Sequence, residues 1–585
     1  MLDCMPSFAR RGDTSDQKST SAPFPVHLLL VLFLTFCILS GCVDPQQGLV
    51  LRQPTRGLTR HLRPTDVAVV TYKNDTWRTG QNAQESILTT LNVNTNSFGK
   101  RMSYPVDGRV YAQPLFVPNL HIHGTLVNVV FVATEHDSVY AFDADAVGDP
   151  RPLWQTSFIA PPDIVPESHD DIYCSDIGGV DVGITGTPVI SLPTHTLYVV
   201  AATKEHGQDI TRLHALDITT GREQAHSPVT ITASFPGAGY SPPYHSVNGM
   251  ISFNTRRANQ RAALLLLHQQ VYIAWGSNCD NPPYYGWLMQ YDASTLQQIS
   301  IYATTPDQEG GGIWQSGAGL ASDAGGNIYL ETGEADFTLS MGGNDAGDAV
   351  LKLNPQGGLH VIDYFAPFNQ FCLSKSNMDL GSAGPLLLPN MPELIASNKG
   401  GNIYVLDRNN MGGYHTIAAP CTQQERTDVD QVLQEFPPGT AAGGVWGSAA
   451  YWHGPSSDYV YISGRGDNLK AFQLTRGLLS QAPSSQAPLV TDPAGLPTHA
   501  SGNPVISCNG QFPGSGIVWL ISHDGVLEAF DAANVRRELY ASTQQQQRDA
   551  LGEASKFSVP TVANGEVFVG TTASLVIYGL LDPAM

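Results

Sequence analysis

The chain has 585 residues, of which 42% are hydrophobic and only 14% charged, a composition typical of globular proteins. Its 57 glycines and 40 prolines favour short strands joined by turns over long helices. The formal net charge of −21, and the lack of any basic run interleaved with aromatic residues, argue against nucleic acid as a partner.

The N-terminal segment has the features of an export signal. Arg10, Arg11 and Lys18 precede the apolar stretch Leu28–Leu39. This stretch is shorter than the roughly 20 residues that a bilayer-spanning helix needs. It ends in Leu39-Ser-Gly-Cys42, which resembles the lipobox of bacterial lipoproteins. An uncleaved anchor helix is the alternative interpretation.

The lipobox resemblance implies cleavage before Cys42 and a diacylglycerol anchor on its sulfur. We therefore expect a lipoprotein signal peptide over residues 1–42, a flexible linker over 43–65 and a folded domain over 66–585. Either interpretation of the N-terminus places the protein outside the cytoplasm. The lipid anchor would tether it to a bacterial membrane.

The cysteines agree with export to an oxidising compartment. Of the 8 cysteines, five remain once Cys4 and Cys37 are removed with the signal and Cys42 is lipidated, so at least one stays unpaired. The remaining ones are Cys174, Cys279, Cys372, Cys421 and Cys508. Cys174 and Cys279 lie in long loops of consecutive repeats, and we expect them to form a disulfide.

A short phrase recurs along the chain. In its clearest copy, Val129–Asp143, an apolar run is followed by a polar turn, a second apolar run and an Asp. The other copies are Leu197–Asp217, Val271–Asp292, Ile328–Asn354, Leu394–Asp407, Tyr459–Gln473, Ile517–Asp531 and the truncated Val567–Leu580. Repetition at this period indicates a propeller or a solenoid. The two apolar runs are expected to form strands that are buried on both faces.

A second element, rich in small residues, precedes each phrase and is expected to form the innermost strand of a blade. Its copies begin at Tyr111, Gly186, Arg261, Ser316, Ser382, Trp446, Ser501 and Ser558. The last phrase lacks an outer strand, whereas Val67–Val70 is an apolar strand without a phrase of its own. We therefore expect Val67–Val70 to complete the last blade. The sequence predicts an all-β fold, an eight-bladed β-propeller of four-stranded blades closed by the N-terminal strand.

Two of the phrases resemble the repeat of the pyrroloquinoline-quinone (PQQ) propeller superfamily. In that repeat an Ala-x-Asp-x-x-Thr-Gly turn is followed by a Trp that docks between blades. Phe142-Asp-Ala-Asp145 with the following Trp154, and the turn Ala215–Gly221, match this pattern. The resemblance covers most of the chain and implies eight blades. The copies that end at Asp217 and Asp531 have no matching Trp, which marks a divergent member of this quinoprotein alcohol dehydrogenase-like group.

Function is expected at one mouth of the channel, where the loops entering the innermost strands meet the turns between second and third strands. Candidate ligand-binding side chains there are Arg109, Glu135, Asp181, Lys204, Arg261, Trp314, Gln315, Lys399 and Trp446, with Asp107, His136, Asp137, Arg465, His523 and Lys556 in a wider set. Two indole faces among cations and carboxylates suit a flat, acidic, oxygen-rich ligand such as PQQ, although sugars and peptide tails fit the same description. Solvated turns, and tryptophans wedged between blades, are the alternative interpretation of these residues.

Three insertions are longer than a blade needs, and long ordered loops often carry function. They are Ser277–Trp287, Glu331–Asp348 and Pro355–Leu380. The second contains Asp345 and Asp348 in a Gly-rich run whose spacing does not match an EF-hand loop. We expect a turn there and no metal site.

The resemblance to quinoprotein alcohol dehydrogenases implies PQQ held beneath a disulfide of adjacent cysteines, Ca²⁺ bound by carboxylates, and an Asp base. The chain departs from this pattern because it has no adjacent cysteines, and no motif assigns the Asp. It also lacks CxxCH, so no fused cytochrome is expected, and it has no Gly-x-Ser-x-Gly elbow of a hydrolase.

Two functions remain open at this point. The first is a membrane-tethered, extracytoplasmic binding or scaffold module that presents its loops to a protein, a glycan or a small-molecule ligand. The alternative is a PQQ-dependent dehydrogenase that oxidises an alcohol or sugar with PQQ and Ca²⁺. The missing cysteine pair and haem motif favour the first function, whereas the charged, Trp-bearing mouth keeps the second open. No catalytic residue is assigned in either case.

Overall fold

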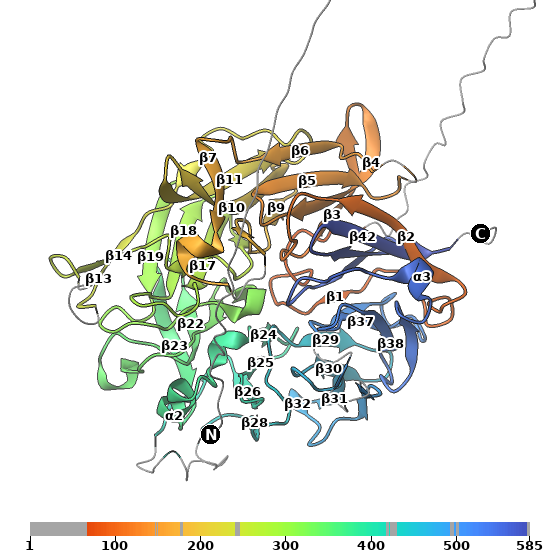
Figure 1. The fold of residues 1–585 in the computed structure, drawn as a ribbon. Helices are drawn as coiled ribbons and strands as arrows, with labels where there is room; N and C mark the ends of the chain where they lie inside the picture. Colours follow the sequence, from red (N-terminus) through yellow and green to blue (C-terminus); the bar gives the residue numbers. More distant parts are fainter. Residues whose placement is uncertain are drawn as a thin grey trace, which may run out of the picture. The chain divides into compact units, whose positions relative to one another are not determined.

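The structure, a computed structural model, contains eight β-sheets of four to six strands that form the blades of a propeller (Figure 1). It describes residues 67–581 except 147, 149, 176–178, 240–245, 417–420, 422–429, 492–496 and 499–501. The blades follow one another around the ring in chain order, and we number them 1 to 8. The all-β, eight-bladed fold predicted from the repeats is confirmed.

The two recurring sequence elements build the inner part of every blade. The small-residue element leads into the innermost strands of blades 1 to 8, which are β3 (Leu115–Ile122), β9 (Val189–Ser191), β16 (Leu265–Leu267), β20 (Ala321–Ser322), β24 (Leu386–Leu387), β29 (Ala450–His453), β36 (Val505–Ser507) and β40 (Thr561–Ala563). The first apolar run forms the second strands, β4 (Thr125–Ala133), β10 (Thr196–Glu205), β17 (Gln270–Ser277), β21 (Ile328–Glu331), β25 (Glu393–Ser397), β30 (Asp458–Ile462), β37 (Ile517–Ile521) and β41 (Glu566–Gly570).

The second apolar run pairs antiparallel with the first in each blade. It forms the third strands, β5 (Ser138–Asp143), β11 (Gln208–Asp217), β18 (Trp287–Asp292), β22 (Val350–Asn354), β26 (Ile403–Asp407), β31 (Lys470–Thr475), β38 (Leu527–Asp531) and β42 (Ser574–Leu580). The outer strands are β6 (Trp154–Ser157), β12 (Val229–Thr230), β19 (Gln298–Ala303), β23 (His360–Ala366), β28 (Gln434–Phe436), β32 (Leu478–Leu479), β39 (Glu538–Ala541) and, in blade 8, β2 (Phe98–Pro105).

The remaining elements are short additions to this plan. The extra strands are β1 (Gln81–Asn82), β7 (Ile164–Ser168), β8 (Asp181–Val182), β13 (Ser234–Pro236), β14 (Met250–Ser252), β15 (Ala258–Asn259), β27 (Gly413–Tyr414), β33 (Ser485–Gln486), β34 (Val490–Thr491) and β35 (Pro497–Thr498). The helices are α1 (His169–Ile172), α2 (Gln370–Lys375) and α3 (Gln546–Asp549), with single 3₁₀ turns η1 (Gln315–Gly317), η2 (Leu339–Met341) and η3 (Leu380–Ser382).

The hydrophobic core lies between the blades. Phe131 and Val139 of blade 1 pack with Ile190 and Leu197 of blade 2 in one cluster of buried side chains, and similar clusters join other neighbouring blades. Each large side chain buried in this way contributes about 1.5–3 kcal/mol of transfer free energy. Both faces of the second and third strands are covered, which explains why their sequences are continuously apolar.

The ring closes where blade 8 meets blade 1. The Phe116 and Phe568 rings stack with centroids 5.5 Å apart, and β3 contacts β40. The fourth strand of blade 8 is β2, which pairs antiparallel with β42. The prediction that Val67–Val70 completes the last blade was wrong, because Val69 forms an isolated bridge with Phe116 of blade 1. After this bridge the chain turns into the channel and reaches the edge of blade 8 only with β2.

The segment Val69–Asn82, which we call the plug, fills the axis of the propeller. The amides of Phe116, Ile190, Ser322, Leu387, Tyr451 and Ile506, each on the innermost strand of a different blade, donate hydrogen bonds of 2.7–3.0 Å to its carbonyl groups. Asn82 Nδ2 donates to Val562 O of blade 8 at 3.0 Å. The free edges of the innermost strands therefore find their hydrogen-bond partners in one shared segment, as buried backbone groups require.

The N-terminal predictions concern another part of the chain. The signal peptide over 1–42, the lipidated Cys42 and the linker over 43–65 lie outside the described residues. Within the part of the chain that is described, no helix has the length and apolarity that a membrane crossing requires.

Candidate functional site

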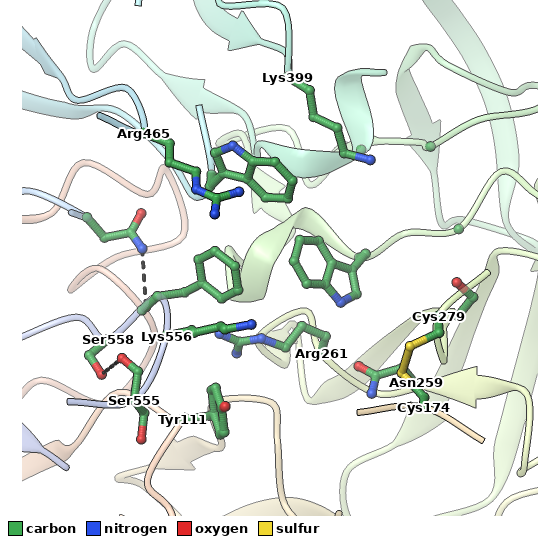
Figure 2. A pocket seen from close by; sticks show the side chains of 18 of the residues that line it. Tyr111, Cys174, Asn259, Arg261, Cys279, Lys399, Arg465, Ser555, Lys556 and Ser558 are labelled. Atoms are coloured by element: carbon green, nitrogen blue, oxygen red, sulfur yellow. Dashed lines mark hydrogen bonds between the residues drawn. A yellow bond between two sulfur atoms is a disulfide. The ribbon is translucent and has the colours of Figure 1, made fainter. Parts of the chain in front are cut away.

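A cavity of about 630 Å³ lies on the propeller axis, at the mouth formed by the loops that enter the innermost strands. Every blade contributes to its lining, and blades 1 to 8 supply, in order, Arg109, Cys174, Arg261, Trp314, Lys399, Trp446, His523 and Phe557. In the view of Figure 2, Lys399 and Arg465 enter from the top, Arg261 and Tyr111 lie below them, and the Cys174–Cys279 disulfide lies at the lower right. The cavity is large enough for a small organic molecule.

Three aromatic side chains meet in this cavity. The Trp314 ring contacts Phe557 edge-on with centroids 5.4 Å apart and Trp446 edge-on at 6.2 Å, while Trp446 and Phe557 are nearly parallel at 6.2 Å. The backbone beneath them is strained, because Gln315, Ser316 and Phe557 have φ values of 50°, 49° and 62°. Residues with a side chain rarely adopt this left-handed region, and such strain is typical of functional sites.

Arg261 is a buried cation beside these rings. It is only 2% exposed, its Nη1 donates one hydrogen bond of 3.2 Å to Thr185 O, and no carboxylate of the described residues forms an ion pair with it. Its Cζ lies 5.4 Å from the Tyr111 ring centroid and 5.7 Å from that of Phe557. Burial lowers the pKa of Arg261 below its usual value. The site thus holds a guanidinium whose charge no neighbouring carboxylate neutralises directly.

Lys399 lies in the opposite wall, among oxygen atoms. Its Nζ is 3.0 Å from Glu334 Oε1 and 2.7 Å from Asp379 Oδ1, and it also donates to Asn377 Oδ1. The ammonium lies 5.6 Å from the Trp446 ring centroid. Burial opposes its charged form, but the Asp379 and Glu334 carboxylates hold the pKa of Lys399 above its usual value. We therefore treat Lys399 as charged.

Further cations lie around the rim. Arg465 is exposed, with its Cζ 5.9 Å from the Trp446 ring centroid. Arg109 pairs with Glu553 at 3.2 Å, and Lys556 also lines the cavity. The lining holds five Lys or Arg side chains and four carboxylates, Asp280, Glu334, Asp379 and Glu553, so its net charge favours an anion.

A disulfide joins two loops at this mouth. Cys174 of blade 2 is bonded to Cys279 of blade 3, the pair expected from the sequence, and both line the cavity. A second disulfide, Cys372–Cys421, was not anticipated. Cys508 is free and buried, and burial raises the pKa of its thiol to about 11.

The structure brings together five of the nine ligand-binding candidates predicted from the sequence. Arg109, Arg261, Trp314, Lys399 and Trp446 line the cavity, as do Arg465, His523 and Lys556 of the wider set. Strand order placed these residues correctly, because all of them lie in loops at one end of the blades.

The other four candidates are not among the lining residues, because their side chains bind other parts of the chain. Glu135 accepts hydrogen bonds from Gly183 N at 2.7 Å and Thr185 Oγ1 at 3.1 Å. Asp181 pairs with His136, and Lys204 pairs with Asp171. Gln315 is fully buried, accepting from Glu331 N at 2.9 Å and donating to Ala318 O at 3.0 Å. These four candidates therefore lie outside the lining of this cavity.

Several lining residues were not predicted. Glu334, Asp379 and Asn278 lie in the three long insertions, which the sequence marked as places for function without assigning their residues. Asn259 and Phe557 lie in loops that enter innermost strands and carried no motif.

The two aspartates of the Gly-rich run accept hydrogen bonds from backbone amides. Asp345 accepts from Asp307 N at 2.9 Å, and Asp348 accepts from Leu380 N at 2.8 Å.

Buried carboxyl groups outside the cavity lead to a prediction about pH. Burial raises the pKa of Glu167 to about 8 and that of Glu135 to about 7. A carboxyl group with a raised folded-state pKa stabilises the fold below its unfolded pKa of about 4.3, and this contribution is lost as the pH rises through the folded-state value. We expect the free energy of unfolding to fall between pH 5 and pH 8.

The Glu167→Gln variant should flatten this dependence by roughly 2–4 kcal/mol across the interval, because its amide does not titrate. Urea unfolding at four pH values measures the effect. Asp170→Asn is the matched control, since Asp170 is 97% exposed in the adjacent helix α1. Equal slopes for wild type and Glu167→Gln would show that Glu167 does not carry the pH dependence.

Comparison with known proteins identifies the fold. No protein-family model matches the chain, and no curated protein matches it. Similar solved structures include the quinohaemoprotein alcohol dehydrogenase of Pseudomonas putida HK5, with TM-score 0.55, 15% identity, and coverage of 88% of this chain and 82% of that one. The quinohaemoprotein alcohol dehydrogenase of Comamonas testosteroni has a TM-score of 0.54 and 16% identity, with coverage of 88% of this chain and 80% of that one. A europium-containing methanol dehydrogenase has a TM-score of 0.53 and 12% identity, with coverage of 88% of this chain and 99% of that one. The predicted resemblance in fold to quinoprotein alcohol dehydrogenases is confirmed, and at these identities the likeness extends to the fold alone.

Proposed function

We propose that the axial cavity binds a flat, anionic, oxygen-rich small molecule, and that the protein acts as a binding propeller. Arg261 carries this proposal, since it is 2% exposed, lines the cavity and has no carboxylate partner among the described residues. A buried charge without a partner is costly, and an anionic ligand would supply the missing counter-charge. Bidentate pairing of a guanidinium with a carboxylate is the strongest contact of this kind.

The aromatic side chains indicate the shape of the ligand. Trp314, Trp446 and Phe557 present ring faces and edges within one cavity, held by a strained backbone. Such surfaces bind planar or ring-shaped molecules. A conjugated carboxylate such as PQQ and an acidic sugar both combine a flat ring with negative charge.

The second candidate function is that of a PQQ-dependent dehydrogenase acting on an alcohol or sugar, which the shared fold favours. The organic part of PQQ fits the residues present, because Arg261, Arg465 and Lys556 could hold its carboxylates beside the tryptophans. When bound, PQQ would supply a quinone that accepts electrons from the substrate. The role of this chain would be to orient the ring and neutralise its carboxylates.

Calcium does not fit the cavity as well as PQQ does. Lys399 already pairs with both Glu334 and Asp379. Among the described residues no three His, Cys, Asp or Glu side chains come together in a way that could hold a metal ion. For this reason we favour the binding function over the dehydrogenase.

The location of the protein is also a proposal. The Leu39–Cys42 lipobox supports a lipid anchor at Cys42 in a bacterial membrane, with the propeller outside the cytoplasm. The disulfides Cys174–Cys279 and Cys372–Cys421 are in keeping with such an oxidising compartment. The proposed binding function also includes a protein or glycan partner that docks at the same mouth.

Titration of PQQ into the full chain in detergent, followed by thermal unfolding, tests the function. Because a ligand at 100 times its Kd stabilises the native state by about 2.7 kcal/mol, binding should raise the Tm by a few degrees. The double variant Trp314→Ala, Trp446→Ala should unfold at the wild-type Tm without PQQ and lose the PQQ-induced rise.

Unfolding of the double variant would instead assign the two tryptophans a structural role. No rise at saturating PQQ would reject PQQ as the ligand and the dehydrogenase with it, and galacturonate would be titrated next as the acidic sugar. If neither compound raises the Tm, the small-anion proposal fails. Alcohol-dependent reduction of an artificial electron acceptor in the presence of PQQ would favour the dehydrogenase.

A further inference from the structure

The arrangement around Lys399 resembles the shell of a bound metal ion more than an ordinary ion pair. Three oxygen atoms approach its Nζ, and they belong to the carboxylates of Glu334 and Asp379 and to the side-chain amide of Asn377. Carboxylate and amide oxygens are the ligands that Ca²⁺ takes in proteins, whereas an ammonium offers three N–H donors to the same set. One cation thus satisfies oxygen atoms from two insertions at once.

The Asp379 carboxylate is fixed in place by the backbone around it. A Cβ atom on Gly381 would lie 2.8 Å from Asp379 Oδ2 and 2.6 Å from the backbone of Gly333, so glycine is required for this carboxylate to reach the cavity wall. The Lys399 amide donates to Asp379 O at 3.1 Å, which joins the two partners through the main chain as well. The Asp379 carboxylate is therefore preorganised.

The ammonium also belongs to the cavity. Lys399, Glu334, Asp379 and Asn377 all line it, and the Trp446 ring centroid is 5.6 Å from Nζ. A ligand that stacks on Trp446 would lie beside this charge.

We propose that the Lys399 ammonium takes the place of a divalent cation in this cavity, so that ligand binding there requires no metal. The inference shares its cavity with the proposed function but does not depend on the identity of the ligand. It implies that removal of the ammonium, with both carboxylates retained, opens an oxygen-lined cation site.

The Lys399→Ala variant tests this with Ca²⁺ alone as the probe. The full chain in detergent is unfolded thermally in EDTA and in millimolar Ca²⁺. The wild-type Tm should be the same in both, whereas Lys399→Ala should unfold at a lower temperature in EDTA and recover by about 3 °C or more in Ca²⁺. Lys470→Ala is the matched control, because Lys470 pairs with Asp467 outside the cavity and its removal leaves a single carboxylate.

Terbium(III), which binds calcium sites and emits when a nearby tryptophan is excited, places the ion. Emission is expected from Lys399→Ala, not from wild type, and should fall in Lys399→Ala with Trp446→Phe. Strong emission from wild type that Asp379→Asn removes would overturn the proposal, since a metal would then bind beside Lys399. The proposal also fails if Lys399→Ala gains nothing from Ca²⁺.

Refolding and chelation give two further outcomes that support or overturn the proposal. If Lys399→Ala does not fold in EDTA, it is refolded from urea with and without Ca²⁺, and recovery that requires Ca²⁺ supports the proposal while its absence overturns it. PQQ binding that EDTA abolishes in wild type would reject metal independence and leave the proposed function intact. Failure of PQQ to bind would bear on the proposed function, whereas the calcium result would still decide the role of Lys399.

Discussion

Replacing Arg261 by Met is expected to stabilise the unliganded protein and to abolish its response to the ligand. Arg261 is 2% exposed and has one hydrogen bond to the chain, from Nη1 to Thr185 O at 3.2 Å. Replacing a buried ion pair with apolar residues of similar volume is often stabilising, by about 1–4 kcal/mol, and a buried charge without a partner has no Coulombic gain to offset its desolvation. Loss of a buried charge pair with a bound anion should cost about 2–5 kcal/mol of binding free energy.

Thermal unfolding with and without PQQ measures both effects in one experiment. The Arg261→Met variant should show a higher Tm than wild type without PQQ and no further rise with it. Arg465→Met is the matched control, because Arg465 is an exposed cation of the same cavity, and its loss should change the ligand response less. A lower Tm for unliganded Arg261→Met, with the ligand response retained, would make Arg261 a structural residue and remove the main support for an anionic ligand.

The opposite signs of these effects are what a binding site predicts. A side chain with a purely structural role should raise the free energy of unfolding of the free protein. A side chain that pairs with a ligand can lower it, and this cost is offset only when the ligand is bound. The strained φ of 62° at Phe557, whose ring faces Arg261, is in keeping with this.

The blades could be predicted from the sequence because each one repeats the same local pattern. The copy Val129–Asp143 contains two apolar runs and a turn. Its two runs pair as β4 and β5, with Val129 opposite Asp143 at one end and Ala133 opposite Val139 at the other. Strand order then placed Arg261, Trp314 and Trp446 at one mouth without knowledge of any contact. The loops that enter the innermost strands all lie at the same end of the propeller, because these strands run in the same direction.

The errors arose where side chains or strand lengths differ between blades. Lys204 lies near the end of β10, which with β11 forms a hairpin of 10-residue strands, so its turn is carried away from the cavity, and Lys204 meets Asp171 instead. Glu135 and Gln315 are in the expected loops, but their side chains satisfy buried backbone amides. No sequence pattern distinguishes a turn side chain that binds a ligand from one that binds its own backbone.

The carboxylates of the cavity were missed for a different reason. Glu334 and Asp379 come from separate insertions, and both pair with Lys399 in the folded chain. The plug was missed because its role depends on hydrogen bonds to seven blades, which no local periodicity records. Tertiary contacts of this kind are visible only in the folded chain.

The plug leads to the largest expected loss of stability, that of Arg78→Met. Arg78 is fully buried, like Arg261, but its guanidinium makes several hydrogen bonds to the chain. Nε donates to Leu320 O at 2.8 Å, and Nη1 donates to Thr71 Oγ1 at 2.8 Å and to Tyr72 O at 2.9 Å. Removing these donors leaves buried oxygen atoms unsatisfied, at about 1–3 kcal/mol each.

We therefore expect Arg78→Met to lower the free energy of unfolding by about 3–5 kcal/mol, in contrast to the gain expected for Arg261→Met. Urea unfolding of the two variants beside wild type measures the difference. Arg537→Met is the control for loss of a cation near the surface, because Arg537 pairs with Asp531 at 3.2 Å but is 53% exposed, and its effect should stay below about 1 kcal/mol. If Arg78→Met were as stable as wild type, the hydrogen bonds of Arg78 would not be what holds the plug to the blades, and the free edges of the innermost strands would be sufficient to keep it on the axis.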